Sequence, residues 1–129
     1  MKSKRAMLEK IIKLAEARNS EEERLKKKYK IYYIDFFNPK QNELEWDKAP
    51  RPKGAEFKEY LASLNEGDII YVATVMYGGR DYLTYGEEED FEGLYNYLKP
   101  RVKGLIYSVM EKVPLPDYLR AGIKVFKIK

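Results

Sequence analysis

The Gly78-Gly79 pair is the feature that most restricts how this chain can fold. Two apolar runs, residues 68–77 and 80–85, flank the pair, and side-chain character alternates along both. Two glycines between such runs are typical of a β-hairpin, because the tight turn needs positive φ, which glycine adopts without strain. The sequence therefore predicts a hairpin over residues 68–85 with a two-residue turn.

The predicted turn fixes which side chains share each face of the hairpin. Successive side chains of a strand point to opposite faces, so pairing across the turn sorts the residues into two sets. One set is expected in the core: Ile70, Val72, Met76, Leu83 and Tyr85. The other forms a tyrosine-rich surface: Tyr71, Ala73, Val75, Tyr77, Arg80, Tyr82 and Thr84. We expect this second face to bind a partner.

Missing residue types narrow the chemistry open to the chain. None of its 129 residues is cysteine or histidine, which excludes disulfides, catalysis by thiolate or imidazole, and zinc sites built from those ligands. We expect no cofactor. The length suits one domain, residues 1–129, and no apolar run is long enough for a membrane span, so a cytoplasmic protein is expected. Abundant lysine and glutamate resemble hyperthermophile compositions, and a cellular, plasmid or viral setting stays open.

Charge is unevenly distributed along the chain. The net charge is +4, but residues 1–43 carry +5 and residues 99–129 carry +6, whereas residues 44–86 carry −2. An acidic run, Glu87 to Asp90, lies between the basic ends. Basic ends favour a polyanionic partner, although a solvated lysine surface explains them equally well.

The other segments supply helices and strands around the hairpin. Apolar spacing and caps predict helices at 3–18, 20–29, 55–64 and 88–98. Strands are expected at 30–37 and 123–128, with a short edge strand at 43–46, while 103–113 fits strand or helix, with strand favoured. The predicted fold is α+β: N-terminal helices at 1–29, then a core at 30–129 in ferredoxin-like β-α-β-β-α-β order with an extra C-terminal strand.

Aromatic side chains would gather on the open face of such a sheet. Tyr33 and Tyr82 would lie on its two central strands, with Tyr71 and Tyr77 beside them. This arrangement resembles the RNA-recognition-motif family, in which aromatics on those strands stack on bases. The resemblance covers topology and aromatic placement, because residues 80–85 lack the glycine and the spacing of that family's motif.

The sequence therefore favours a small, non-catalytic nucleic-acid-binding module. Tyr33, Tyr71, Tyr77 and Tyr82 are expected to stack on bases. Basic side chains are expected to contact phosphates: Arg80, Lys26, Lys27, Lys28, Lys124, Lys127 and Lys129. No catalytic or metal-binding residue is assigned.

Two other functions stay open. The chain could be a homo-oligomeric or adaptor protein whose N-terminal helix and tyrosine face contact partners, including a second copy. It could also be a magnesium-dependent nuclease using Asp35, Asp81 and the acidic run at 87–90. For that function two or more carboxylates must converge, and we expect that Asp35, in mid-strand, and Asp81, near the turn, do not.

Overall fold

The fold is built from helices. A computed structural model describes residues 3–129, and within them every regular element is helical, with no strand. The elements are α1 (Lys4–Tyr29), α2 (Gln41–Lys48), α3 (Pro52–Ser63), α4 (Glu66–Tyr85), α5 (Phe91–Leu98), a 3-10 turn η1 (Lys99–Arg101), α6 (Val102–Glu111) and α7 (Leu115–Val125). The predicted α+β ferredoxin-like fold, with its open sheet and extra C-terminal strand, is therefore wrong.

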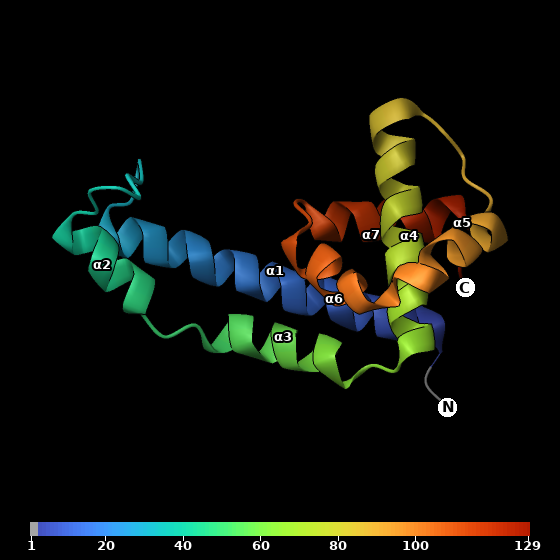
Figure 1. The fold of residues 1–129 in the computed structure, drawn as a ribbon, viewed down its shortest axis with the longest axis horizontal. Helices are drawn as coiled ribbons and strands as arrows, with labels where there is room; N and C mark the ends of the chain where they lie inside the picture. The colour runs from blue at the N-terminus through green and yellow to red at the C-terminus, as the bar shows by residue number, and fades with distance from the viewer. Residues whose placement is uncertain (1–2) are drawn as a thin grey trace.

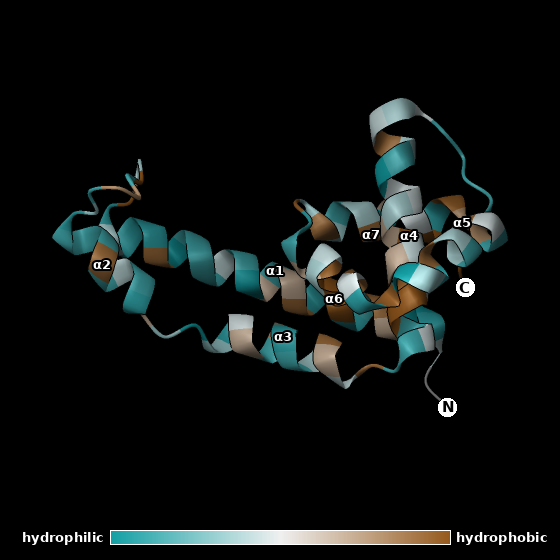
Figure 2. Cartoon of the chain, viewed as in Figure 1, coloured by the Kyte–Doolittle hydropathy of each residue, from teal (hydrophilic) through white to brown (hydrophobic). Residues whose placement is uncertain are grey.

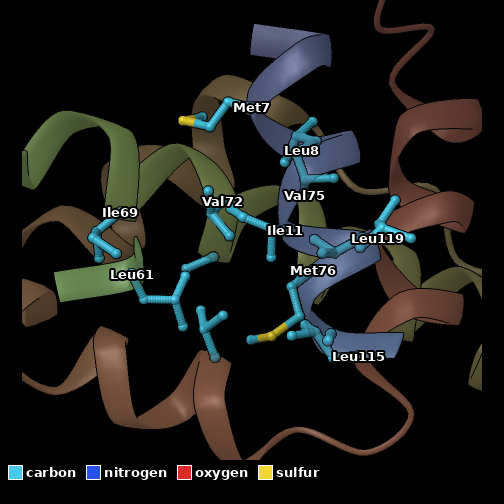
Figure 3. Close-up of a cluster of buried hydrophobic side chains, with 14 of the residues drawn as sticks. Met7, Leu8, Ile11, Leu61, Ile69, Val72, Val75, Met76, Leu115 and Leu119 are labelled. Carbon is cyan, nitrogen blue, oxygen red and sulfur yellow. The ribbon is translucent and has the colours of Figure 1, made fainter. Parts of the chain in front are cut away.

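The core lies where α1 and α4 cross. α4 crosses the N-terminal half of α1 (Figure 1). α3 packs alongside α1, whereas α5, α6 and α7 pack around α4. Buried side chains from these helices form one cluster, including Leu8, Ile11, Leu61, Val72 and Leu119 (Figure 3). Hydrophobic residues gather at this crossing, whereas the outer half of α1 is mostly hydrophilic (Figure 2). Within residues 3–129 no helix combines the length and the hydrophobicity needed to cross a membrane.

The predicted hairpin is a single helix, α4. Asn65 caps its N-terminus by accepting a hydrogen bond from the Asp68 amide at 2.8 Å, and Gly86 ends it with φ of 68°. Nearly every residue from Ile69 to Gly79 is buried, so several faces of α4 contact other helices. An apolar run buried on several sides carries no helical period, which is why its alternation suggested strands.

Gly78 and Gly79 serve close packing rather than a turn. A Cβ on Gly79 would lie 1.8 Å from the Tyr118 carbonyl oxygen of α7, and one on Gly122 would lie 2.1 Å from the Val75 oxygen of α4. A Cβ on Gly78 would meet the ring of Phe126 at 2.3 Å. Glycine is needed here because the backbones of α4 and α7 touch.

The two predicted N-terminal helices are one. α1 begins after Ser3, whose hydroxyl accepts from the Ala6 amide at 3.0 Å, and continues through Asn19 and Ser20 to Tyr29. The predicted helix start at Ser20 does not exist, and the neighbouring Glu21 caps another helix instead. The buried Glu21 carboxylate accepts from the amides of Lys53 and Gly54 at 2.9 and 3.0 Å, and so caps α3.

The other predicted strands also change identity. Residues 30–37 form the loop after α1, and the edge strand expected at 43–46 lies within α2. Residues 103–113, for which strand was favoured, belong largely to α6, and 123–128 span the end of α7 and the turn after it. The helices predicted at 55–64 and 88–98 are confirmed, with shifted ends, as α3 and α5.

Candidate functional site

The outer part of α1 and the short helix α2 form a projection, here called the arm (residues 22–48). It lies at one end of the long axis of the molecule, away from the α1–α4 crossing (Figure 1). The Asn42 amide donates to the Tyr29 carbonyl at 2.9 Å and joins α2 to the end of α1. This hydrogen bond therefore links the two sides of the arm.

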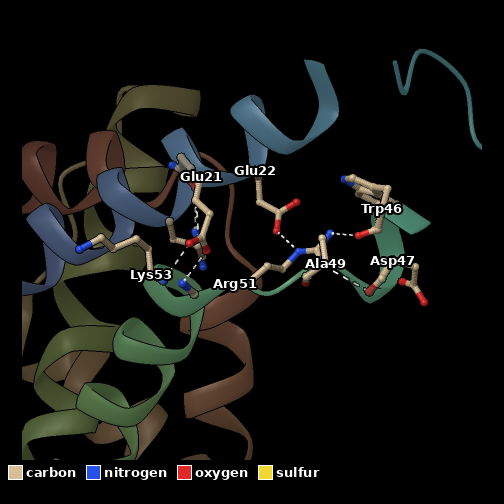
Figure 4. A network of polar contacts seen from close by, with 10 residues as sticks. Glu21, Glu22, Trp46, Asp47, Ala49, Arg51 and Lys53 are labelled. Atoms are coloured by element: carbon tan, nitrogen blue, oxygen red, sulfur yellow. Dashed lines mark hydrogen bonds and ion pairs between the residues drawn. The ribbon is translucent and has the colours of Figure 1, made fainter. Parts of the chain in front are cut away.

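Arg51 fastens the base of the arm. Its guanidinium forms an ion pair with Glu22 of α1 and donates to the carbonyls of Trp46 and Ala49 at 3.0 and 2.9 Å (Figure 4). One side chain thereby satisfies carbonyls at the end of α2 and links them to α1. The arm is attached through polar contacts rather than through the hydrophobic core.

The connection between α1 and α2 exposes aromatic rings and is here called the aromatic loop (residues 30–40). Tyr32, Tyr33, Phe36 and Phe37 are between 80% and 94% exposed. Single exposed apolar side chains are common, but a group of this size is typical of a binding surface, because its hydration is unfavourable. These four side chains are the strongest candidate contacts in the described residues.

Asp35 shapes the tip of the aromatic loop. Its Oδ1 accepts hydrogen bonds from the amides of Phe37 and Asn38 at 3.0 and 3.2 Å. This is an Asx-type turn, in which a carboxylate replaces a backbone acceptor. Asp35 therefore shapes the turn that carries the two exposed phenylalanines. The sequence predicted a strand here, but Asp35 lies in a loop.

Lysines surround the aromatic loop. Lys26, Lys27 and Lys28 occupy the last turn of α1, Lys30 follows its end, and Lys40 precedes α2. All five are exposed, and residues 26–40 carry a net charge of +4. No ion pair found within residues 3–129 engages any of the five. Aromatic surface and uncompensated positive charge thus occur together.

The structure brings some of the predicted site residues together and separates the rest. Tyr33 lies with Lys26, Lys27 and Lys28 at the arm. Tyr71, Tyr77, Arg80 and Tyr82 all lie on α4, while Lys124, Lys127 and Lys129 lie at the C-terminus. That terminus is held beside the start of α1, since Arg5 donates to the Ile128 carbonyl at 2.9 Å. At 1.5 Å per residue, the 22 residue steps of α1 from Arg5 to Lys27 separate that end of the chain from the lysines of the arm by roughly 33 Å.

The α4 tyrosines are mostly engaged within the fold. Tyr71 packs on Phe91 with ring centroids 5.2 Å apart, and burial raises the pKa of its phenol, against a smaller opposite effect of Lys4. Tyr77 lies between cations, with Arg80 4.6 Å and Lys112 4.8 Å from its ring centroid. These two rings are therefore less available for stacking than those of the arm.

Sequence reasoning missed five residues of the arm surface: Lys30, Tyr32, Phe36, Phe37 and Lys40. The pattern that could have identified them is a pair of adjacent tyrosines and a pair of adjacent phenylalanines, bracketed by lysines and followed by Asn38-Pro39. Interpretation of residues 30–37 as a strand assigned only Tyr33 among these aromatic residues to the binding face.

A hollow on another part of the molecule lies between α4, α5 and α6. Its polar lining comprises Tyr77, Arg80, Asp81, Tyr97, Arg101 and Ser108. Arg80 pairs with Asp81 at 3.0 Å, and Arg101 stacks on Tyr97 at 4.0 Å and donates to its carbonyl at 2.6 Å. Both guanidinium groups are thus already held by neighbouring groups, which leaves this hollow a weaker candidate than the arm.

The acidic residues considered for a nuclease do not gather. Asp35 lies in the aromatic loop, whereas Asp81 lies on α4 at the other side of the molecule (Figure 1). Across residues 3–129 no three acidic side chains come close enough to hold a metal ion together. The expectation that Asp35 and Asp81 do not converge agrees with their positions.

Comparison of the chain with protein-family models, curated proteins and solved structures finds no match. The function must therefore be inferred from the exposed residues, charges and contacts described above.

Proposed function

We propose that the chain binds single-stranded nucleic acid through the arm, without catalysis. The supporting observation is the exposure of Tyr32, Tyr33, Phe36 and Phe37 within a group of five exposed lysines. Bases stack on aromatic rings, and ammonium groups neutralise phosphates, so these residue types suit both parts of a nucleotide. The predicted tyrosine-rich sheet face has no place in this proposal, because no sheet exists among the described residues.

The composition of the arm favours binding with little sequence preference. Every base presents a flat face for stacking, and lysine acts as a point charge rather than as the planar, bidentate group that selects guanine edges. The five exposed cations in and beside the aromatic loop are lysines, while the exposed Arg24 lies further back along α1. Unstacked single strands suit this surface better than duplexes, whose bases are already stacked.

The stacking part is tested with a fluorescein-labelled oligothymidylate at low salt, followed by fluorescence anisotropy. Tyr33→Ala and Phe37→Ala should each weaken binding by roughly 1–3 kcal/mol, the usual loss for one stacked base. The matched control is Tyr107→Ala, which removes a ring that is 64% exposed on α6, away from the arm. The control should bind as tightly as the unaltered chain.

The electrostatic part is tested by the salt dependence of the same binding. Replacing Lys26, Lys27 and Lys28 together by glutamine should lower the slope of log K against log salt by roughly 2, since each phosphate contact contributes about 0.7 on single strands. The control replaces Lys58, Lys99 and Lys103, three exposed lysines elsewhere, in the same way. An equal loss in both variants contradicts a localised site.

Two results would reject the proposal. One is the absence of binding to oligonucleotides at low salt. The other is binding to anionic phospholipid vesicles with no oligonucleotide binding, because an aromatic loop with lysines can also insert at a lipid interface.

A further inference from the structure

A second exposed apolar surface lies at the end of α4, here called the α4 tip (residues 82–90). The last turn of α4 extends beyond the core, and the loop to α5 returns along it (Figure 1). Tyr82, Leu83 and Tyr85 are 39%, 54% and 69% exposed there. The tip is an ordered helix end, because the Gly86 amide donates to the Tyr82 carbonyl at 2.9 Å.

The charge of the α4 tip is opposite to that of the aromatic loop. Residues 82–90 carry a net charge of −4 and contain no basic side chain, whereas residues 26–40 carry +4. Asp90 caps α5 by accepting from the Gly93 amide at 2.8 Å. Glu87, Glu88 and Glu89 enter no ion pair among residues 3–129. Their charges are therefore not neutralised within the fold.

The two surfaces cannot meet within one chain. The arm and the α4 tip lie toward opposite ends of the molecule (Figure 1). Each surface combines exposed apolar side chains with unneutralised charge of one sign. Within one chain, neither surface can reach the oppositely charged one. A second copy of this chain supplies the missing complement to both surfaces.

We propose that the aromatic loop of one copy docks on the α4 tip of another. Phe36 and Phe37 would pack against Leu83 and Tyr85, while the surrounding lysines face Glu87, Glu88 and Glu89. Burial of these rings removes exposed apolar surface from both partners, and the paired charges fix their orientation. Because the two surfaces differ, the contact is head-to-tail and produces either a ring or an open chain of copies.

This inference extends beyond nucleic-acid binding and does not depend on it. The α4 tip offers the arm aromatic surface and negative charge, the same two properties that a single strand offers. Self-association and nucleic-acid binding would therefore compete for the arm, and an oligonucleotide should dissociate the assembly.

Sedimentation velocity without nucleic acid tests the contact. The arm variant combines Phe36→Ala with Phe37→Ala, and the tip variant combines Tyr85→Ala with Glu87→Gln, Glu88→Gln and Glu89→Gln. The unaltered chain should form salt-sensitive assemblies that grow with concentration, and each variant alone should be monomeric. These positions are exposed, apart from the half-buried Glu89, and none belongs to the core, so the thermal unfolding of both variants should match that of the unaltered chain.

An equal mixture of the two variants gives the decisive result. Each variant retains one working surface, so the mixture should form heterodimers and nothing larger. A Tyr107→Ala chain should assemble like the unaltered one. A chain that stays monomeric into the millimolar range at low salt overturns the inference, and so does a tip variant that still self-associates. Either result leaves the oligonucleotide assays unaffected, so the two proposals fail separately.

Discussion

Gly79 of α4 and Gly122 of α7 lie against each other with no side chain between them: a Cβ placed on Gly79 would be 2.7 Å from the Gly122 amide nitrogen. Backbones approach this closely only where both residues lack a Cβ. The contact joins the central helix to the last helix and brings the C-terminus to the core. The glycine pair that suggested a turn thus holds two helices together.

Alanine at either glycine should strongly destabilise the fold. Gly79→Ala and Gly122→Ala each force the α4 and α7 backbones apart, and overpacking of this kind usually costs roughly 1–3 kcal/mol or more. Gly78→Ala should cost less, because its nearest neighbour is the Phe126 ring, which can move. Urea unfolding gives the free energies.

Gly104→Ala is the control for these substitutions. Gly104 is exposed within α6, and a Cβ there meets nothing within 4 Å. Alanine should stabilise α6 by up to about 1 kcal/mol because glycine is a poor helix former. Equal effects at Gly104 and Gly79 would contradict the close helix contact.

Loss of the Glu21 carboxylate should destabilise the junction of α1 with α3. Glu21→Ala leaves the Lys53 and Gly54 amides without their acceptor, and we expect a loss of about 1–3 kcal/mol in unfolding free energy. Glu21→Gln keeps one acceptor oxygen and should cost less. Glu23→Ala, at an exposed position on the same helix, should change stability little.

Asp35 should affect binding through the shape of the aromatic loop. Asp35→Asn retains an oxygen that can accept from the Phe37 amide, so oligonucleotide affinity should persist. Asp35→Ala removes the turn and should weaken binding by about 0.5–1.5 kcal/mol, the cost of ordering the loop on binding. Anisotropy titrations measure both. A larger loss in Asp35→Asn than in Asp35→Ala would contradict a turn-forming role.

Stability should decrease in alkaline solution through Tyr71. Burial raises the pKa of its phenol above the usual 10.0, so the folded chain retains the proton more tightly than the unfolded chain. This contribution is complete below pH 10 and is lost as the pH rises from there through the folded pKa. Unfolding free energies from about pH 8 to about pH 11 should fall less steeply for Tyr71→Phe, which has no proton to lose.

Local sequence patterns predicted some of the helices from an apolar period or an acidic first turn, but they missed α4 although Asn65 caps it. The helix at 55–64 carries an apolar period, the helix at 88–98 has an acidic first turn with Asp90 as its cap, and both are confirmed as α3 and α5. α4 has neither a single buried face nor many strong intrinsic helix formers. Its stability comes instead from the helices packed around it. Short-range alternation could not reveal those tertiary contacts.

The sequence predicted only the part of the candidate site whose residues are close together along the chain. Tyr33 and Lys26 to Lys28 are close in sequence, and the structure places them at the same end of the arm. Tyr71, Tyr77 and Tyr82 were assigned to the same surface as Tyr33 only through the predicted sheet. Without the sheet they lie on another helix, where Tyr71 and Tyr77 pack with neighbours.

The continuity of α1 determines how the aromatic loop meets a ligand. A break at Asn19-Ser20 would have left the loop on a hinged segment, free to sample many directions. One unbroken helix of 26 residues, fastened by Glu21 and Arg51, holds it instead at a set distance and direction from the core. In the proposed complex, less orientational entropy would therefore be lost on binding than with a hinged segment.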